Sequence, residues 1–192
     1  MTAPVNLTTE RLLLRGFRES DIPELVRLAG AREVAATTLL IPHPYLEPDA
    51  RDFLLRSSES LRQGQSMAFA ITVAASGDLC GGMGLRMEPE QLRAELGYWI
   101  AVPFWRRGYC TEAAKRVLSY GFQELLLNRI FAQTFAGNTA SQRVLEKLGM
   151  RHEGILRQHL QKWGVFVDIH CYGVLRQEFC SHHQRGDKEK RG

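Results

Sequence analysis

The sequence of 192 residues predicts an α/β domain, because segments with strand and helix patterns alternate along most of its length. Two stretches carry this prediction. At 93–125, a short apolar strand stops at Pro103, and a basic turn containing Gly108 leads into a helical run. At 129–148, the strand RIFAQTF is followed by a turn and a second helix, which stops at Gly149. We therefore expect two strand-turn-helix units in succession.

Further elements are expected on both sides of these units. They are a strand at 11–17, a helix starting at Ser20-Asp21, a helix at 49–63, a β-hairpin of strands 67–74 and 79–87, and two late strands at 150–156 and 168–175 joined by a turn near Trp163-Gly164. Residues 37–48 contain three prolines and no clear period, which indicates a loop that packs on the fold or covers a substrate pocket. His43 and Tyr45 in this loop are more readily explained by packing than by substrate contact.

Composition limits the classes of protein that this chain can represent. We expect one domain at 1–180 and a polar tail at 181–192 that is disordered. No apolar run is long enough to cross a bilayer and the N-terminus lacks a signal-peptide layout, so a cytoplasmic protein without a membrane partner is expected. The four cysteines have no metal-ligand spacing, so no metal is expected. A net charge of +4 does not indicate a nucleic-acid partner, although it favours anionic ligands.

The turn WRRGYCT, at 105–111, is the first candidate site. Thr111 is a good N-cap, and we expect the helix to begin there. A helix N-terminus presents unpaired N–H groups and the positive end of the dipole, while Gly108 allows a ligand to approach the backbone. Arg106 and Arg107 would add charge-assisted hydrogen bonds to phosphate oxygens. An ordinary loop with solvated arginines explains this stretch about equally well when it is taken alone.

Four stretches together resemble one known family. They are TERLLLRGFRESD at 9–21, AELGYWI at 94–100 with WRRGYCTEAA after it, GNTASQRVLEKLGM at 137–150, and EGILRQHLQKWGVFVDIHCYGVLRQEF at 153–179. In this order they resemble the GNAT superfamily of N-acetyltransferases, and within it the RimJ/RimL-like branch that acetylates ribosomal-protein N-termini. The resemblance implies a mixed, mostly antiparallel central sheet that splays between two parallel strands, here 93–102 and 129–135, and is flanked by helices. It also implies acetyl-CoA as co-substrate.

The resemblance further implies where acetyl-CoA would bind. Backbone groups of Ile100, Ala101 and Val102 would pair with the pantetheine amides as an added strand does. The pyrophosphate would lie against the turn formed by Arg106, Arg107, Gly108, Tyr109, Cys110 and Thr111. Asn138 and Ser141 resemble residues near the pantetheine arm and the sulfur. Both also have helix capping as an alternative role, and a capping box of Thr139 with Gln142 is another way to start the same helix.

Acetyl transfer to an amine needs a base, an oxyanion donor and a proton for the leaving thiolate. Glu95 resembles the glutamate that several GNAT enzymes use as base, but pairing with an outer arginine, as a strand glutamate can, is an equally good role. A backbone N–H near Ile100 or Val102 is the implied oxyanion donor. Many GNAT enzymes protonate the sulfur with a tyrosine, and Leu145 occupies that position here. Ser141 is therefore the expected acid, ahead of Tyr172.

The identity of the acceptor amine is restricted by the resemblance to the RimJ/RimL-like branch and by the fraction of each kind of amine that is neutral at pH 7. An α-amine with a pKa near 8 is roughly a tenth neutral at pH 7, whereas a lysine amine is neutral at about one part in a few thousand. A weak base therefore suffices for direct attack by a protein or peptide N-terminus in a ternary complex. Small amines such as polyamines, amino acids or antibiotics, and a CoA-ester sensor without turnover, stay open as alternatives, as do monomer and homodimer. Asp168 matches a recurrent acidic position of the branch, where stabilising the last hairpin is favoured over positioning substrate.

Overall fold

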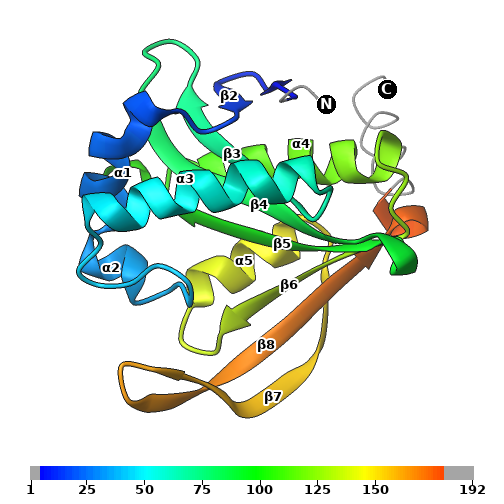
Figure 1. The fold of residues 1–192 in the computed structure, drawn as a ribbon. Helices are drawn as coiled ribbons and strands as arrows, with labels where there is room; N and C mark the ends of the chain where they lie inside the picture. Colours follow the sequence, from blue (N-terminus) through cyan, green and yellow to red (C-terminus); the bar gives the residue numbers. More distant parts are fainter. Residues whose placement is uncertain (1–4, 180–192) are drawn as a thin grey trace.

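The computed structural model describes residues 5–179, and one eight-stranded sheet runs through them (Figure 1). Its strands are β1 Leu7–Thr8, β2 Leu12–Arg15, β3 Ser66–Val73, β4 Leu79–Glu88, β5 Arg93–Ile100, β6 Arg129–Phe135, β7 Arg151–Lys162 and β8 Val165–Leu175, in the spatial order β1-β2-β3-β4-β5-β6-β8-β7. Neighbouring strands are antiparallel except β5 and β6, which are parallel. The predicted mixed, mostly antiparallel sheet is confirmed.

Within residues 5–179, five α-helices flank this sheet. They are α1 Ile22–Ala29, α2 Arg32–Ala35, α3 Glu47–Arg62, α4 Tyr109–Gln123 and α5 Thr139–Lys147. Figure 1 shows α1, α2 and α3 in front of the sheet and α4 behind it. One buried cluster joins α4 and α5 to strands β2 to β6 and β8, while a second joins α1 and α3 to Ala70, Leu79 and Ala101. The chain therefore has a hydrophobic core on each face of the sheet.

Local sequence explains most of these elements. In α1, the buried side chains Ile22, Leu25, Leu28 and Ala29 recur at helical spacing, and Pro23 lies in the first turn. The helix α3 begins two residues before its predicted start at Asp49, whose carboxylate accepts a hydrogen bond from the Leu46 N–H at 2.7 Å. Two short elements, β1 and α2, were not predicted because each has too few residues to show a period.

Two further expectations on chain organisation can be compared with the structure. Residues 36–46 form a loop without helix or strand, as predicted for most of 37–48. The polar tail predicted at 181–192 lies outside the described residues. Within residues 5–179, no helix combines the length and the apolar character needed to cross a bilayer.

Candidate functional site

The parallel strands β5 and β6 diverge along their length. They pair at Arg93 with Arg129, Ala94 with Ile130 and Glu95 with Phe131, and no register continues beyond Glu95 although β5 runs on to Ile100 and β6 to Phe135. On its other side, β5 stays paired with β4 as far as Ile100. A gap therefore opens in the sheet between the carboxyl halves of β5 and β6.

Backbone groups at the end of β5 are divided between this gap and β4. The Ala101 N–H donates to the Cys80 carbonyl at 2.9 Å, so in an antiparallel ladder the alternate residues Tyr98 and Ile100 turn their backbone groups toward the gap. The Ile100 carbonyl, however, accepts from the Trp105 indole at 2.7 Å, and the Ala101 and Val102 carbonyls accept from the next turn. Of the three predicted pantetheine partners, Ile100 thus offers its N–H to the gap, whereas Ala101 faces β4.

The turn before α4 leaves a row of backbone donors without partners. Arg106 and Gly108 both have left-handed backbone, with φ of 61° and 81°, and no side chain caps the helix. Within residues 5–179, the backbone N–H groups of residues 106–111 donate no hydrogen bond. Successive N–H groups around left-handed residues form an anion-binding concavity. The prediction that Thr111 caps the helix was wrong: Gly108 is the N-cap, because its left-handed backbone turns the chain into the helix three residues earlier.

Charges around this turn suit an anion. Arg106 and Arg107 are exposed, and in the described part of the chain neither forms an ion pair with a carboxylate. The guanidinium of Arg107 lies 5.3 Å from the centre of the Phe104 ring, which holds it beside the turn. A Cβ atom added to Gly108 would have one neighbour within 4 Å, the Arg11 guanidinium at 3.4 Å. The turn is therefore open, positively charged and lined with amides, as a diphosphate requires.

The flank of the turn is fixed by Glu112 in the first turn of α4. Its carboxylate accepts from the Thr9 hydroxyl at 2.6 Å, and from the Arg11 backbone N–H at 2.9 Å and guanidinium Nε at 2.7 Å. Burial alone would raise the pKa of Glu112, but these three donors outweigh it and hold the pKa below its ordinary value. Arg11 also donates to the Arg107 carbonyl at 3.2 Å. Contacts from the β1–β2 segment thus shape the backbone of the turn.

The second helix N-terminus of the site, at α5, is capped by a side chain. Asn138 is the N-cap, and its Oδ1 accepts from the Ser141 backbone N–H at 3.1 Å. The alternative capping box of Thr139 with Gln142 was wrong, because the Gln142 amide donates instead to the Ala136 carbonyl at 2.9 Å. Leu145 is fully buried in the core beneath α5.

Ser141 has a partner that sequence reasoning missed. Its Oγ lies 2.8 Å from the hydroxyl oxygen of Tyr98, which projects from β5. Cys110, at the start of α4, is the third polar side chain here, and burial raises the pKa of its thiol to about 12. Strand alternation would place Tyr98 on the same face as Leu96, but nothing local in the sequence could pair it with a residue 43 positions away.

Glu95 lies on the opposite face of β5. Because side chains alternate along a strand, Glu95 points away from the side that carries Tyr98 and Ser141. It is paired across strands with Arg86, whose Nε donates to the carboxylate at 3.1 Å. The ion pair anticipated as the alternative role of Glu95 is therefore present, and the structure does not bring Glu95 and Ser141 into contact.

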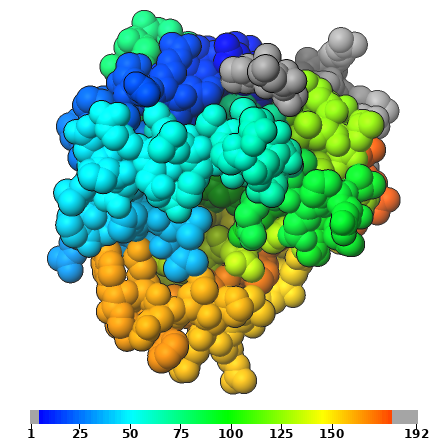
Figure 2. Space-filling model, viewed as in Figure 1, coloured from blue at the N-terminus to red at the C-terminus, as the bar shows by residue number. Residues whose placement is uncertain are grey.

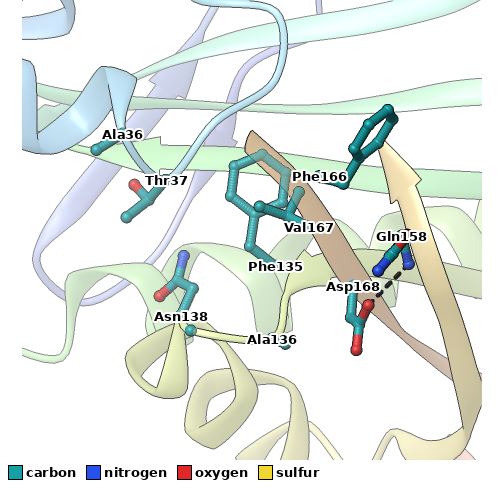
Figure 3. A pocket seen from close by; sticks show the side chains of 10 residues that line it. Ala36, Thr37, Phe135, Ala136, Asn138, Gln158, Phe166, Val167 and Asp168 are labelled. Atoms are coloured by element: carbon teal, nitrogen blue, oxygen red, sulfur yellow. Dashed lines mark hydrogen bonds between the residues drawn. The ribbon is translucent and has the colours of Figure 1, made fainter. Parts of the chain in front are cut away.

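A pocket of about 550 Å³ lies where β6 ends and α5 begins. Figure 3 shows its lining, which is Ala36, Thr37, Phe135, Ala136, Gly137, Asn138, Gln158, Phe166, Val167 and Asp168. One carboxylate oxygen of Asp168 accepts from the Gln158 backbone N–H at 2.7 Å, as expected of a residue that stabilises the last hairpin. Figure 2 shows that this side of the molecule is hollowed between the α2–α3 segment and the orange β7–β8 hairpin. The pocket therefore opens beside Asn138, one helical turn from Ser141.

The loop at 36–46 closes one side of this hollow. Tyr45 is buried in the core of α1 and α3, so the packing role favoured for it is confirmed. His43 is exposed, and its Nδ1–H donates to the Gly30 carbonyl at 3.1 Å. The tip of the β7–β8 hairpin meets the same loop, because the Lys162 ammonium donates to the Ile41 carbonyl at 3.3 Å. Tyr172, the second choice for the acid, is buried on β8.

Comparison with known proteins gives one consistent result. Residues 11–151 match the model of an acetyltransferase (GNAT) domain. The chain is 32% identical over 174 residues to a protein named as an uncharacterised N-acetyltransferase, p20, of Bacillus licheniformis, with 90% of this chain and 97% of that protein covered. It is 36% identical over 104 residues to YdaF of Bacillus subtilis, provisionally named a ribosomal N-acetyltransferase, with 54% and 57% covered. The structure of RimJ from Mycobacterium smegmatis in complex with CoA-disulfide superposes with a TM-score of 0.80 at 22% identity, covering 91% of this chain and 88% of that one.

Proposed function

The chain belongs to the GNAT family and is an N-acetyltransferase, and from this premise we propose that its acceptor is the α-amine of a protein or peptide N-terminus. The family uses acetyl-CoA, which supplies the acetyl group as a thioester. The row of unpartnered N–H groups at 106–111 supports the proposal that this turn holds the pyrophosphate. The Ile100 N–H at the gap is the proposed donor to the pantetheine arm or to the oxyanion.

The pocket beside Asn138 is the observation that carries the choice of acceptor. Its volume of about 550 Å³ and its open setting between the 36–46 loop and the β7–β8 hairpin suit the end of a polypeptide. Phe135, Phe166 and Val167 would contact apolar side chains, while Asp168 places a negative charge where an ammonium group approaches. The name given to YdaF, a relative over about half of the chain, supports a ribosomal protein as the acceptor.

The proposed acceptor, an α-amine, needs only a weak base to lose its proton. Glu95 carries an ion pair with Arg86, and an α-amine is already about a tenth neutral at pH 7. We propose that Glu95 assists the loss of the amine proton, directly or through water, and that Ser141 protonates the leaving sulfur. The amine attacks directly while both substrates are bound, so no acetylated form of the chain is expected.

An acceptor panel tests the proposal. Thiol release from acetyl-CoA would be measured with peptides that carry a free N-terminus, the same peptides with a blocked N-terminus and a lysine, polyamines, and amino-acid or antibiotic amines. We expect release with free N-termini at a rate at least tenfold above the lysine peptides. Preference for a small amine would contradict the α-amine assignment, and CoA binding without release on any amine would indicate a sensor.

The Glu95→Gln and Arg86→Ala variants separate the two roles of Glu95. Both remove the ion pair, but only Glu95→Gln removes the carboxylate. If Glu95 is the base, Glu95→Gln lowers kcat about tenfold and makes the rate follow the titration of the amine itself, while Arg86→Ala keeps the kcat of the unmodified protein. Equal and full kcat in both variants would leave Glu95 with the structural role only.

A further inference from the structure

The contact between Tyr98 and Ser141 joins the two sides of the gap in the sheet. Tyr98 lies in the diverging half of β5, and Ser141 lies in the first turn of the helix that follows β6. Their hydroxyl oxygens are 2.8 Å apart, and the Tyr98 hydroxyl is also 3.4 Å from the Ser141 carbonyl. In the described part of the chain, Tyr98 is the one hydrogen-bond partner of the Ser141 hydroxyl.

The surroundings keep the Tyr98 phenol neutral. Burial raises its pKa far above the usual value, Cys110 raises it further, and the hydrogen bond with Ser141 lowers it by less. Cys110 is protonated as well, since its own pKa is about 12. The Tyr98 phenol and the Cys110 thiol are therefore both protonated at neutral pH, and the Tyr98 hydroxyl keeps its proton over the whole range in which an α-amine titrates.

The direction of the hydrogen bond follows from the chemistry of the two hydroxyls. Either hydroxyl could donate at this distance, and a phenol is a stronger hydrogen-bond donor than an aliphatic alcohol, which favours Tyr98 as the donor and the Ser141 Oγ as the acceptor. The Ser141 hydrogen is then free to point at a third partner. A hydrogen bond received at Oγ also stabilises negative charge that develops there when Ser141 gives up its proton.

We propose that Tyr98 is a positioning residue for acetyl transfer, which orients and polarises the Ser141 hydroxyl toward the leaving sulfur. The proposal rests on the proposed function, in which Ser141 is the acid. Transfer to an amine breaks one C–S bond, leaving the electron pair on sulfur, and forms one C–N bond, while one proton passes in net from nitrogen to sulfur. Glu95 takes the amine proton and passes it to water, Ser141 gives its proton to sulfur and regains one from water, and Tyr98 keeps its own proton throughout.

A double-mutant cycle tests this assignment, with Tyr98→Phe, Ser141→Ala and the combination of both. Tyr98→Phe removes one oxygen and preserves the ring that packs against the core. We expect it to lower kcat about tenfold, with the KM for acetyl-CoA and the calorimetric Kd for CoA unchanged. Ser141→Ala should lower kcat about a hundredfold. The double variant should be no slower than Ser141→Ala, because Tyr98 has nothing left to act on.

The fall in kcat at unchanged KM separates this role from a purely structural one, and a control variant and a stability measurement support it. The control Tyr120→Phe removes a hydroxyl from a buried tyrosine on α4, away from the gap, and should keep full kcat. Unfolding in urea should show coupling between Tyr98 and Ser141 in the free protein, independently of activity.

Several results would overturn the proposal. They are full kcat in Tyr98→Phe, a double variant slower than Ser141→Ala by the full Tyr98→Phe factor, or a loss confined to CoA affinity. Full kcat in Ser141→Ala would instead remove the acid role in the proposed function, and with it the target of Tyr98. An unmodified protein that releases no thiol with any amine would refute the proposed function itself.

Discussion

Two strand-turn-helix units meet at the gap in the sheet, and their helix N-termini differ. At α4, left-handed Arg106 and Gly108 leave the N–H groups of residues 106–111 without acceptors among the described residues, and no side chain caps the helix. At α5, Asn138 caps the helix through the Ser141 N–H. The turn before α4 therefore leaves its backbone N–H groups available to a ligand, whereas the turn before α5 pairs one of its N–H groups with its own Asn138 side chain.

The difference has a physical cost that points to function. A non-glycine residue such as Arg106 in the left-handed region costs on the order of 1 kcal/mol, and a glycine N-cap such as Gly108 forgoes roughly a few tenths of a kcal/mol relative to a capping side chain. At α5, the Asn138 side chain supplies the capping hydrogen bond that the α4 turn lacks. We attribute both penalties at the α4 turn to a ligand that supplies the missing acceptors. At α5, the cap fixes the position of Ser141.

Gly108→Val is the change with the largest expected effect on this comparison. A branched side chain would enter the space in front of the amides and would be strained at a φ of 81°. We expect the Kd for CoA, measured by calorimetry, to rise about a hundredfold, which is about 2.7 kcal/mol.

A matched control separates lost binding from strained backbone. Gly77 lies in the β3–β4 turn with a φ of 79° and no neighbour within 4 Å of an added Cβ atom, so Gly77→Val imposes similar backbone strain away from the site. It should lower the free energy of unfolding by about as much as Gly108→Val and keep the affinity for CoA. Equal CoA affinity in both variants would mean that the α4 turn is not the phosphate site.

Much of this contrast could not be predicted from the sequence, although most of the fold could. The β6 strand matches its predicted residues 129–135 because period and composition are local properties. Thr111 was assigned as the cap from residue preference, but the φ of Gly108 decides where α4 begins. The Tyr98 contact and the Arg86 partner of Glu95 depend on strand register and helix placement, which no local pattern specifies.

Asn138 offers the next test, on the capped side. Asn138→Ala removes the acceptor for the Ser141 N–H and should lower the free energy of unfolding by about 1 kcal/mol, whereas Asn138→Asp retains an acceptor and should keep it. Both changes remove the amide donor, so CoA affinity should fall by the same few-fold factor in each if Asn138 also contacts the pantetheine arm. Equal destabilisation in the two variants, measured by urea unfolding, would contradict the capping role.

The smallest expected effect concerns the pH dependence of stability at the α4 turn. Three donors lower the pKa of Glu112 in the folded protein, against the opposing effect of burial, so they stabilise the fold when the carboxylate is ionised. That stabilisation is complete above the ordinary glutamate pKa of about 4.3 and is lost as the pH falls below it through the folded value. Glu112→Gln should therefore be less stable than the unmodified protein at pH 7, with a difference that shrinks between about pH 5 and pH 3.

Glu24→Gln breaks an exposed ion pair with Arg27 on α1 and should show a smaller difference at pH 7. If the Glu112→Gln difference in unfolding free energy were constant from pH 7 to pH 3, the carboxylate charge would not be what ties the β1–β2 segment to the turn.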